Sequence, residues 1–339
     1  MTIPYRTRRA LRRVGMGLLV ILILSLVIWI CWMFWLGRFV VYTRDKGAYF
    51  DFNQSSLDIR GQEAIAPPPA EKVPVYFNEG EHSLNVSKEL AQISGYYITE
   101  EELINDMEGM KAKLMNLERG TAVMLDVKNI QGGFLYNSTV GTARAKQVDV
   151  EAMAELISSL RANDLYAIAR VPAFRDYYYG LNHLSDGLAA PGGYLWMDDA
   201  RCYWLNPSSS GTLAYLASIV TELQDLGFNE VVFYDFRFPD TTNIVFNGDR
   251  AESLAQAADF LVSTCATEYF TVSFEGNSSF ALPEGRCRLL IGGVAAAEAA
   301  DVAEAIGLDK PAERLVFLTD LHDTRFDAYS VLRPISTAH

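Results

Sequence analysis

The sequence predicts an α/β fold, a (β/α)8 barrel of the TIM type with degenerate C-terminal units, preceded by a single N-terminal transmembrane helix. Short apolar runs alternate with amphipathic helical stretches from about residue 93 onward, which is typical of parallel strands joined by helices. Seven strand-then-helix steps fit into this part of the chain, and a further short run can supply an eighth strand; this count favours a closed barrel over an open sheet. Charged residues stand at the C-terminal ends of the runs, where such a barrel opens onto its active-site face.

The N-terminal segment 17–36 is apolar, uncharged and long enough to cross a bilayer as a helix. Arginines are in excess on its N-terminal side, so we expect the N-terminus in the cytoplasm and everything downstream outside the cell. A cleaved signal peptide is the alternative, but the apolar core is long for one, and bulky tryptophans leave no small-residue cleavage site behind it. We therefore predict a single-pass signal anchor in the cell membrane that contacts lipid through residues 17–36.

The chain is predicted to divide into four parts, of which the anchor is the second. Residues 1–16 form a basic cytoplasmic segment. Residues 37–88 are polar and irregular around the proline run Ala66–Ala70, and such a run has the extended, semi-rigid character of a stalk. Residues 89–335 form the barrel domain.

The charge of the chain is unevenly distributed. Residues 1–46 carry eight Lys or Arg and one Asp, a net charge of +7, so the remaining residues carry −20 of the total of −13. So acidic a surface disfavours nucleic acids and anionic polymers as partners and is compatible with neutral sugars. The sequence has no CxxC or His-rich spacing, no GxSxG, no P-loop and no GxGxxG, so we expect neither a metal nor a cofactor.

The barrel strands are predicted where apolar runs are bounded by turn residues. The best defined is the run of four apolar or aromatic residues at 231–234, which is followed by Asp235 and has the uninterrupted character of a strand buried on both faces. The complete set of predicted strands is 93–98, 121–128, 165–171, 231–234, 269–275, 288–291, 314–320 and 328–332.

Helices are predicted between the strands from apolar residues that recur on one face. Thr99 and Glu102 form a capping box at the start of the first helix, and Asp149 can cap the second. No helix fits between Asp320 and Ala328, so the last unit is expected to be degenerate. The predicted helices are 100–114, 150–160, 211–226, 250–265 and an alanine-rich stretch ending at 306, and long loops are expected at 129–147 and 172–207.

The charged strand ends would meet at one mouth of a parallel barrel. Asp235 and Glu275, on neighbouring strands, are the candidate catalytic pair, because glycoside hydrolysis needs one carboxylate as nucleophile or base and another as proton donor. Adjacent strands lie about 5 Å apart, which fits the retaining geometry better than the wider inverting one. The candidate substrate-binding residues are Tyr97, Asp126, Lys128, Arg170, Trp196, Trp204, Arg237 and Asp320, with the two tryptophans supplied by the aromatic loop 172–207.

Each candidate also has a structural explanation. Asp235, Glu275 and Asp320 could belong to turns that follow their strands. Asp126 and Lys128, two residues apart, could form a structural ion pair. The arginines Arg170 and Arg237 could pair with Asp235 as well as bind substrate, and the loop aromatics could pack among themselves.

Several stretches carry a family resemblance in their order along the chain. The sequences VMLDVK at 123–128, IARV at 168–171 with FRD at 174–176, WLNP at 204–207, and LGFNE at 226–230 followed by YDFRFP at 234–239 resemble the glycoside hydrolase-like domain of bacterial envelope proteins. That family has "iDvK", "ARivvFkD", "WldP" and "GFdeiqfDYiRFP" in the same order. The resemblance implies a TIM barrel that acts on polysaccharide, and Asp126, Lys128, Arg170, Asp235 and Arg237 are assigned to its motifs.

Two departures from the family pattern bear on function. Asn206 stands where the family has a carboxylate, and Glu275 belongs to no motif. The predicted function is therefore a membrane-anchored, extracytoplasmic glycoside hydrolase-like protein that acts on an envelope or extracellular glycan. The alternative is a catalytically inactive barrel that binds cell-wall glycan or organises an envelope complex. A polysaccharide deacetylase is disfavoured because the His and Asp residues of its metal site are missing.

Overall fold

The computed structural model describes residues 16, 19, 22–33, 40–43, 47–50, 89–141, 143–145, 148–276 and 280–338. The chain divides into two compact units, residues 1–78 and residues 79–339. In the first unit, residues 22–33 are helical, and β1 (Val40–Thr43) pairs with β2 (Gly47–Phe50) in an antiparallel sheet. This pairing falls within the predicted stalk, where no strand was expected.

The predicted membrane span, residues 17–36, lies partly outside the described residues. Among the residues that the structure describes, no helix is both long and apolar enough to cross a membrane. The large apolar side chains described between residues 16 and 33 are exposed.

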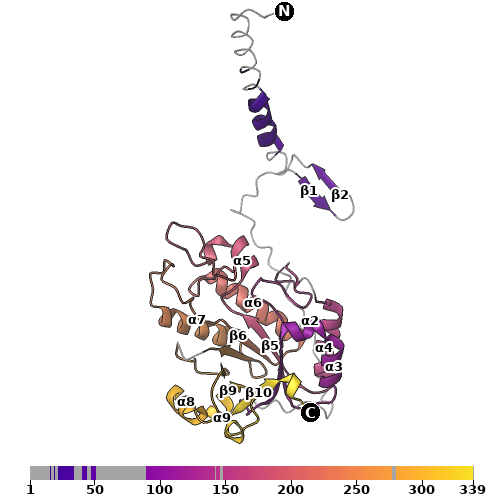
Figure 1. The fold of residues 1–339 in the computed structure, drawn as a ribbon, viewed down its shortest axis with the longest axis vertical. Helices are drawn as coiled ribbons and strands as arrows, with labels where there is room; N and C mark the ends of the chain where they lie inside the picture. Colours follow the sequence, from indigo (N-terminus) through magenta and orange to yellow (C-terminus); the bar gives the residue numbers. More distant parts are fainter. Residues whose placement is uncertain are drawn as a thin grey trace, which may run out of the picture. The chain divides into compact units, whose positions relative to one another are not determined.

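The second unit contains a closed barrel of eight parallel strands in the order β10-β3-β4-β5-β6-β7-β8-β9 (Figure 1). β10 pairs with both β9 and β3, which closes the sheet and confirms the predicted barrel. The strands are β3 (Ser94–Ile98), β4 (Ala122–Asp126), β5 (Tyr166–Pro172), β6 (Glu230–Tyr234), β7 (Thr271–Glu275), β8 (Leu289–Gly292), β9 (Leu315–Leu318) and β10 (Ser330–Pro334).

The helices follow the predicted order, with one division and two additions, the short helices at 177–182 and 311–314. The first predicted helix is split at Asp106, which ends one helix and caps the next by accepting a hydrogen bond from Gly109 N at 2.9 Å. The last unit has only a short 3-10 turn, so its predicted degeneracy is confirmed. The helices are α2 (Glu100–Asn105), α3 (Met107–Leu114), α4 (Val150–Ala162), α5 (Tyr177–Asn182), α6 (Ser210–Leu226), α7 (Arg250–Cys265), α8 (Ala299–Ile306) and α9 (Pro311–Arg314), with 3-10 turns η1 (Leu184–Asp186), η2 (Thr324–Phe326) and η3 (Ile335–Thr337).

The barrel interior is apolar at mid-height and polar at both ends. Side chains two residues apart on a strand face the same side, so the polar residues at the C-terminal ends continue the inward rows of the apolar ones. The mid-height cluster consists of Ile93, Ala122, Met124, Ile168, Val232, Leu290, Val316 and Leu332. Tyr97, Asp126, Arg170, Tyr234 and Glu275 follow it toward the C-terminal ends of the strands.

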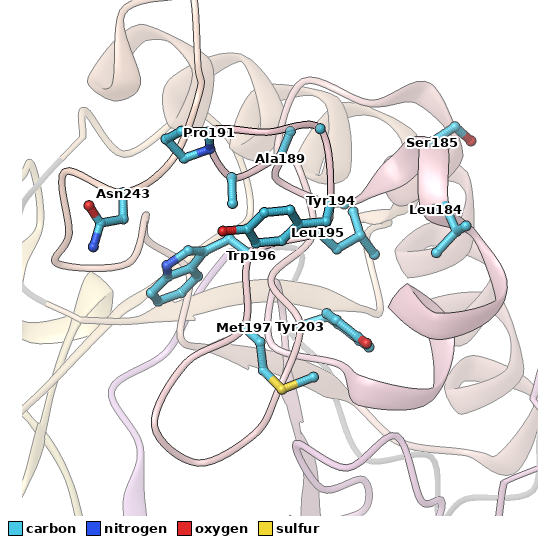
Figure 2. A pocket seen from close by; sticks show the side chains of 13 residues that line it. Leu184, Ser185, Ala189, Pro191, Tyr194, Leu195, Trp196, Met197, Tyr203 and Asn243 are labelled. Carbon is cyan, nitrogen blue, oxygen red and sulfur yellow. The ribbon is translucent and has the colours of Figure 1, made fainter.

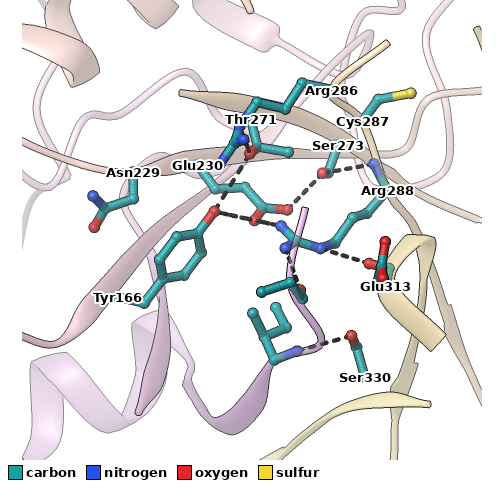
Figure 3. A network of polar contacts seen from close by, with 12 residues as sticks. Tyr166, Asn229, Glu230, Thr271, Ser273, Arg286, Cys287, Arg288, Glu313 and Ser330 are labelled. Atoms are coloured by element: carbon teal, nitrogen blue, oxygen red, sulfur yellow. Dashed lines mark hydrogen bonds and ion pairs between the residues drawn. The ribbon is translucent and has the colours of Figure 1, made fainter. Parts of the chain in front are cut away.

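A buried polar network occupies the other end of the interior. Figure 3 shows Glu230 between Tyr166, Ser273 and Arg288. Tyr166 donates to Glu230 at 3.0 Å, Ser273 donates at 2.5 Å, and the Arg288 guanidinium pairs with the same carboxylate. Burial and the neighbouring Glu230 raise the pKa of Tyr166 to about 12, so its hydroxyl stays a donor. The polar side chains of this end thus have partners within the barrel.

Gly95 on β3 lies opposite Ala122 on β4. A Cβ atom at this position would collide with the backbone carbonyl of Ala122, and backbone cannot move aside as a side-chain end can. Gly95→Ala is therefore expected to lower the free energy of unfolding by about 1–3 kcal/mol. The change is measured by urea unfolding. Gly292→Ala is the control, because a Cβ there would make ordinary contacts with Leu318; equal stability of the two variants would contradict the prediction.

Candidate active site at the barrel mouth

One arginine connects two carboxylates at the C-terminal ends of the strands. Arg170 on β5 contacts Asp126 on β4 through Nη1 at 2.9 Å, and Glu275 on β7 through Nε at 2.5 Å and Nη2 at 2.9 Å. Burial lowers the pKa of Arg170, but the hydrogen bonds and charges of Glu275 and Asp126 outweigh burial, and the pKa is raised. This bidentate arrangement is among the stronger ion-pair geometries. The structure therefore brings these three predicted site residues together.

Two tyrosines complete this inner part of the mouth. The Arg170 guanidinium lies 4.1 Å from the centre of the Tyr234 ring, and burial followed by the charge of Asp126 raises the pKa of Tyr234. Burial, and then the charge of Asp320, raises the pKa of Tyr97. Asp320 itself is exposed, and the hydroxyl of Thr319 accepts from Leu321 N in the turn there.

Asp235 lies just beyond the end of β6, in the left-handed backbone region with φ of 50°. Residues other than glycine rarely adopt this backbone conformation, and Asn and Asp adopt it more readily than most. Residues held in it are enriched at functional sites. The family motif has its carboxylate before the tyrosine, whereas here Tyr234 precedes Asp235. The assignment of Asp235 to that motif position is therefore off by one residue. The inward position at the end of β6 belongs to Tyr234.

The partners of Asp235 differ from those predicted. Arg237 Nη2 lies 3.4 Å from Asp235 Oδ1, as the sequence suggested, but Arg170 contacts Asp126 and Glu275 instead. The other partner is Arg175, whose Nη1 lies 3.1 Å from Asp235 Oδ2.

A second arginine bridge links Asp235 to the aromatic loop. Arg175 Nη2 contacts Asp198 at 2.8 Å, while its Nη1 contacts Asp235. Burial raises the pKa of Asp198, but hydrogen bonds from the backbone of Cys202 and the indole of Trp204, together with Arg175, lower it below its usual value. Sequence reasoning missed Arg175 and Asp198 as site residues. Arg175 lies within the quoted FRD stretch, whereas Asp198 has no signal beyond its place in the aromatic loop.

The two predicted tryptophans have different surroundings. Trp204 is buried, donates to Asp198 at 2.9 Å, and has the Arg237 guanidinium 5.0 Å and the Arg175 guanidinium 5.6 Å from its ring. Its ring therefore supports the partners of Asp235. Trp196 is half-buried and lines open space.

Lys128 is not part of the mouth. β4 ends at Asp126, and the Lys128 side chain is fully buried with Nζ 2.5 Å from Asp176 Oδ2. The structural pair considered for Asp126 and Lys128 is therefore not formed, because each has a different partner. Lys128 contacts another buried side chain and is not placed to touch a substrate at the strand ends.

Two hollows adjoin the Asp235 side of the mouth. The first has a volume of 620 Å³ and is lined by Arg175, Arg237 and Trp204, the residues around Asp235, and by the acidic residues Asp198, Asp199 and Asp240. The second has a volume of 1020 Å³ and lies within the aromatic loop (Figure 2). Trp196, Met197 and Asn243 line both hollows, so the two lie next to each other.

The described residues offer no cluster of three or more His, Cys, Asp or Glu placed to hold a metal ion. Cys202, Cys265 and Cys287 are buried and unpaired with one another. Burial raises the pKa of the Cys202 and Cys265 thiols to about 11, which makes them poor nucleophiles. The polar side chains that the structure brings to the mouth are carboxylates, arginines and tyrosines.

The closed barrel of eight parallel strands, with its charged residues at the C-terminal ends of the strands, is a TIM barrel. The chain belongs to the family described as "putative glycosyl hydrolase domain", whose model matches residues 93–269. A search of curated proteins gave no match.

Solved structures with similar chains include two glycoside hydrolases. A hypothetical protein from Ruminiclostridium thermocellum is 19% identical, with 53% of this chain and 96% of that one covered and a TM-score of 0.46. The glycoside hydrolase domain of PelA from Pseudomonas aeruginosa is 13% identical, with 73% and 95% covered and a TM-score of 0.43. A family 20 exo-β-N-acetylglucosaminidase from Vibrio harveyi is 7% identical, with a TM-score of 0.48. The match covers 68% of this chain but only 42% of the Vibrio enzyme.

Proposed function

We propose that the barrel hydrolyses glycosidic bonds of a polysaccharide, with Asp235 as nucleophile or base and Glu275 as proton donor. The observation that carries this proposal is that Asp235 follows β6, whose neighbour β7 ends at the carboxylate Glu275, while the arginine partners of Asp235 line an aromatic hollow. Two carboxylates beside a substrate groove are the arrangement that glycoside hydrolysis requires.

Asp235 is held by longer contacts than Asp126 and Asp198. Its contacts with Arg175 and Arg237 are 3.1 and 3.4 Å long. Asp198 by contrast accepts three bonds of 2.8–2.9 Å, and Asp126 accepts from Arg170 at 2.9 Å and from Glu100 N at 3.0 Å. A loosely held carboxylate on a rigid strand end can approach a sugar carbon or a water without first breaking a strong bond.

Glu275 must leave Arg170 before it can act as an acid. Both of its oxygens accept from that guanidinium, and a carboxylate needs a proton on one oxygen to donate it. In this proposal, sugar hydroxyls compete for Arg170 and Asp126 when substrate enters. Tyr97, Arg237, Trp196 and Asp320 then line the rest of the sugar site.

The same Arg170 bridge favours a second function, a barrel that binds glycan without cleaving it. If Arg170 stays paired with Glu275 when a sugar is bound, the mouth has no proton donor at this position. The hydrolase and the binding protein therefore differ in one measurable respect, the release of new reducing ends.

The test is glycan cleavage by the full-length protein. Wild type is incubated with a panel of neutral polysaccharides, and reducing ends are measured for wild type, Asp235→Asn and Glu275→Gln. We expect cleavage by wild type and a loss of about 10²–10⁴-fold in each variant. Asp259→Asn, an exposed aspartate on α7, is the matched control and should retain wild-type activity. Binding of a glycan with no reducing ends from any protein would reject the hydrolase in favour of the binding barrel.

We propose in addition that residues 17–36 anchor the chain in the cell membrane, with the barrel outside. The length and lack of charge of this segment and the arginine excess before it support the proposal. The protein is expected to stay in the membrane fraction after alkaline carbonate extraction, and protease added to intact cells should remove the barrel. Release by carbonate, or protection of the barrel in intact cells, would contradict it.

A further inference from the structure

The two adjacent hollows, the first of which is lined by the arginine partners of Asp235, have more space than one sugar needs. Their volumes are 620 and 1020 Å³, and sites of about 300–1,000 Å³ already accommodate drug-sized ligands, which exceed a single hexose. We propose that they form one groove that binds several consecutive units of an uncharged glycan chain. This proposal rests on the proposed function and specifies its substrate as a neutral polymer.

Aromatic residues line both hollows: Tyr194 and Trp196 line the second, and Trp196 and Trp204 line the first. Tyr194 is 67% exposed and lines the second hollow together with Trp196 and Asn243, which Figure 2 labels. The centres of the Trp196 and Trp204 rings lie 6.3 Å apart. The Arg237 guanidinium lies 5.0 Å from the centre of the Trp204 ring and also contacts Asp235. Exposed ring faces bind the apolar faces of sugars, and a side chain such as Asn243 can bond hydroxyls.

The charges of the groove select against anionic chains. In the first hollow, Asp198, Asp199 and Asp240 outnumber the two arginines, and Arg175 is already paired with Asp198 and Asp235. A uronic-acid polymer would bring like charges to these carboxylates, whereas an uncharged chain would not.

Hydrogen bonds fix the aromatic loop that lines the second hollow. Within the loop, Asp186 accepts from Ser209 Oγ at 2.7 Å and from Tyr179 Oη at 3.0 Å, and Asp198 accepts from Cys202 N and Trp204 Nε1 at 2.9 Å each. A groove held by such bonds before a ligand arrives loses little entropy on binding. The groove is therefore suited to contribute affinity for units distant from Asp235.

The test measures binding of neutral oligosaccharides of one to six units (chito-, cello- and xylo-series) to the full-length protein by calorimetry. In at least one series, affinity should rise with length beyond three units. Tyr194→Ala should weaken the hexamer about tenfold and should weaken shorter members less. Tyr269→Ala, which removes another exposed tyrosine ahead of the N-terminal end of β7, is the control and should leave hexamer affinity unchanged.

The outcomes separate this proposal from the proposed function. Equal affinity for dimer and hexamer, an unchanged hexamer affinity in Tyr194→Ala, no binding of any series, or equal binding of polygalacturonate overturns the groove. Length-dependent binding that is lost in Tyr194→Ala, but without new reducing ends from any substrate, supports the groove and overturns only hydrolysis. Cleavage of a glycan whose binding affinity does not rise with chain length supports hydrolysis and overturns only the groove.

Discussion

Replacing Arg288 by methionine is expected to lower the free energy of unfolding by about 3–5 kcal/mol, because it leaves the carboxylate of Glu230 buried without its charge partner. The loss extends beyond that pair. Arg288 also donates to the backbone carbonyls of Glu313 at 2.9 Å and Ala91 at 2.9 Å, so the guanidinium connects the segment before β3 with the region before β9. Urea unfolding of the full-length chain, followed by tryptophan fluorescence, measures the change.

The double variant Glu230→Met/Arg288→Met tests whether the unpaired charge of Glu230 causes the loss of stability in Arg288→Met. Removing both partners leaves no unpaired buried charge, so the double variant should be more stable than Arg288→Met alone. If the double variant is the less stable of the two, the cost comes from lost packing and backbone contacts and not from an uncompensated carboxylate.

Lys128→Met is expected to have an effect of similar size at the other buried ion pair. Asp176 is 1% exposed and caps α5 by accepting from Tyr179 N at 2.8 Å, while Tyr215 Oη donates to it at 2.9 Å. Without Lys128, the buried carboxylate loses its only cationic partner in the described part of the chain. We expect a loss of about 3–5 kcal/mol.

This variant should also loosen the loop that follows β5. Limited proteolysis should therefore cut within residues 176–205 earlier in Lys128→Met than in wild type. Lys111→Met is the matched control, since Lys111 forms an exposed pair with Glu155, and exposed pairs contribute little. If both lysine variants unfold at the same urea concentration, burial of the Lys128 pair does not make it stronger.

The barrel itself was predictable from sequence because its signals are local. Each strand is a short apolar run, and the capping boxes and glycine stops of the helices lie within a few residues of what they cap. Thr99 and Glu102 form the predicted box, and Gly227 ends α6 in the left-handed conformation. The split at Asp106 was missed because both halves have the same apolar face, and only the backbone of Asp106 separates them.

The site was less predictable because its pairing depends on loops. Strand ends placed Asp126, Arg170 and Glu275 at one mouth, but no spacing rule shows that Arg170 pairs with Glu275 two strands away and leaves Asp235 to Arg175. Arg175 and Asp198 meet only after the chain has passed through some twenty residues of aromatic loop. Lys128 was misplaced for a simpler reason. The strand ends at Asp126, so period-two alternation does not continue to residue 128.

The arginine that joins Asp126 to Glu275 has an evolutionary consequence. With one cation shared by two carboxylates, loss of Arg170 would leave two like charges facing each other, and loss of Glu275 would leave the cation with half its partners. A substitution of Arg170 alone or of Glu275 alone is therefore costly, whichever occurs first, whereas replacing both can restore the charge balance. Homologous sequences are expected to keep or exchange the three residues as a set, so their joint presence, and not Glu275 alone, would mark members of the family that share this mouth.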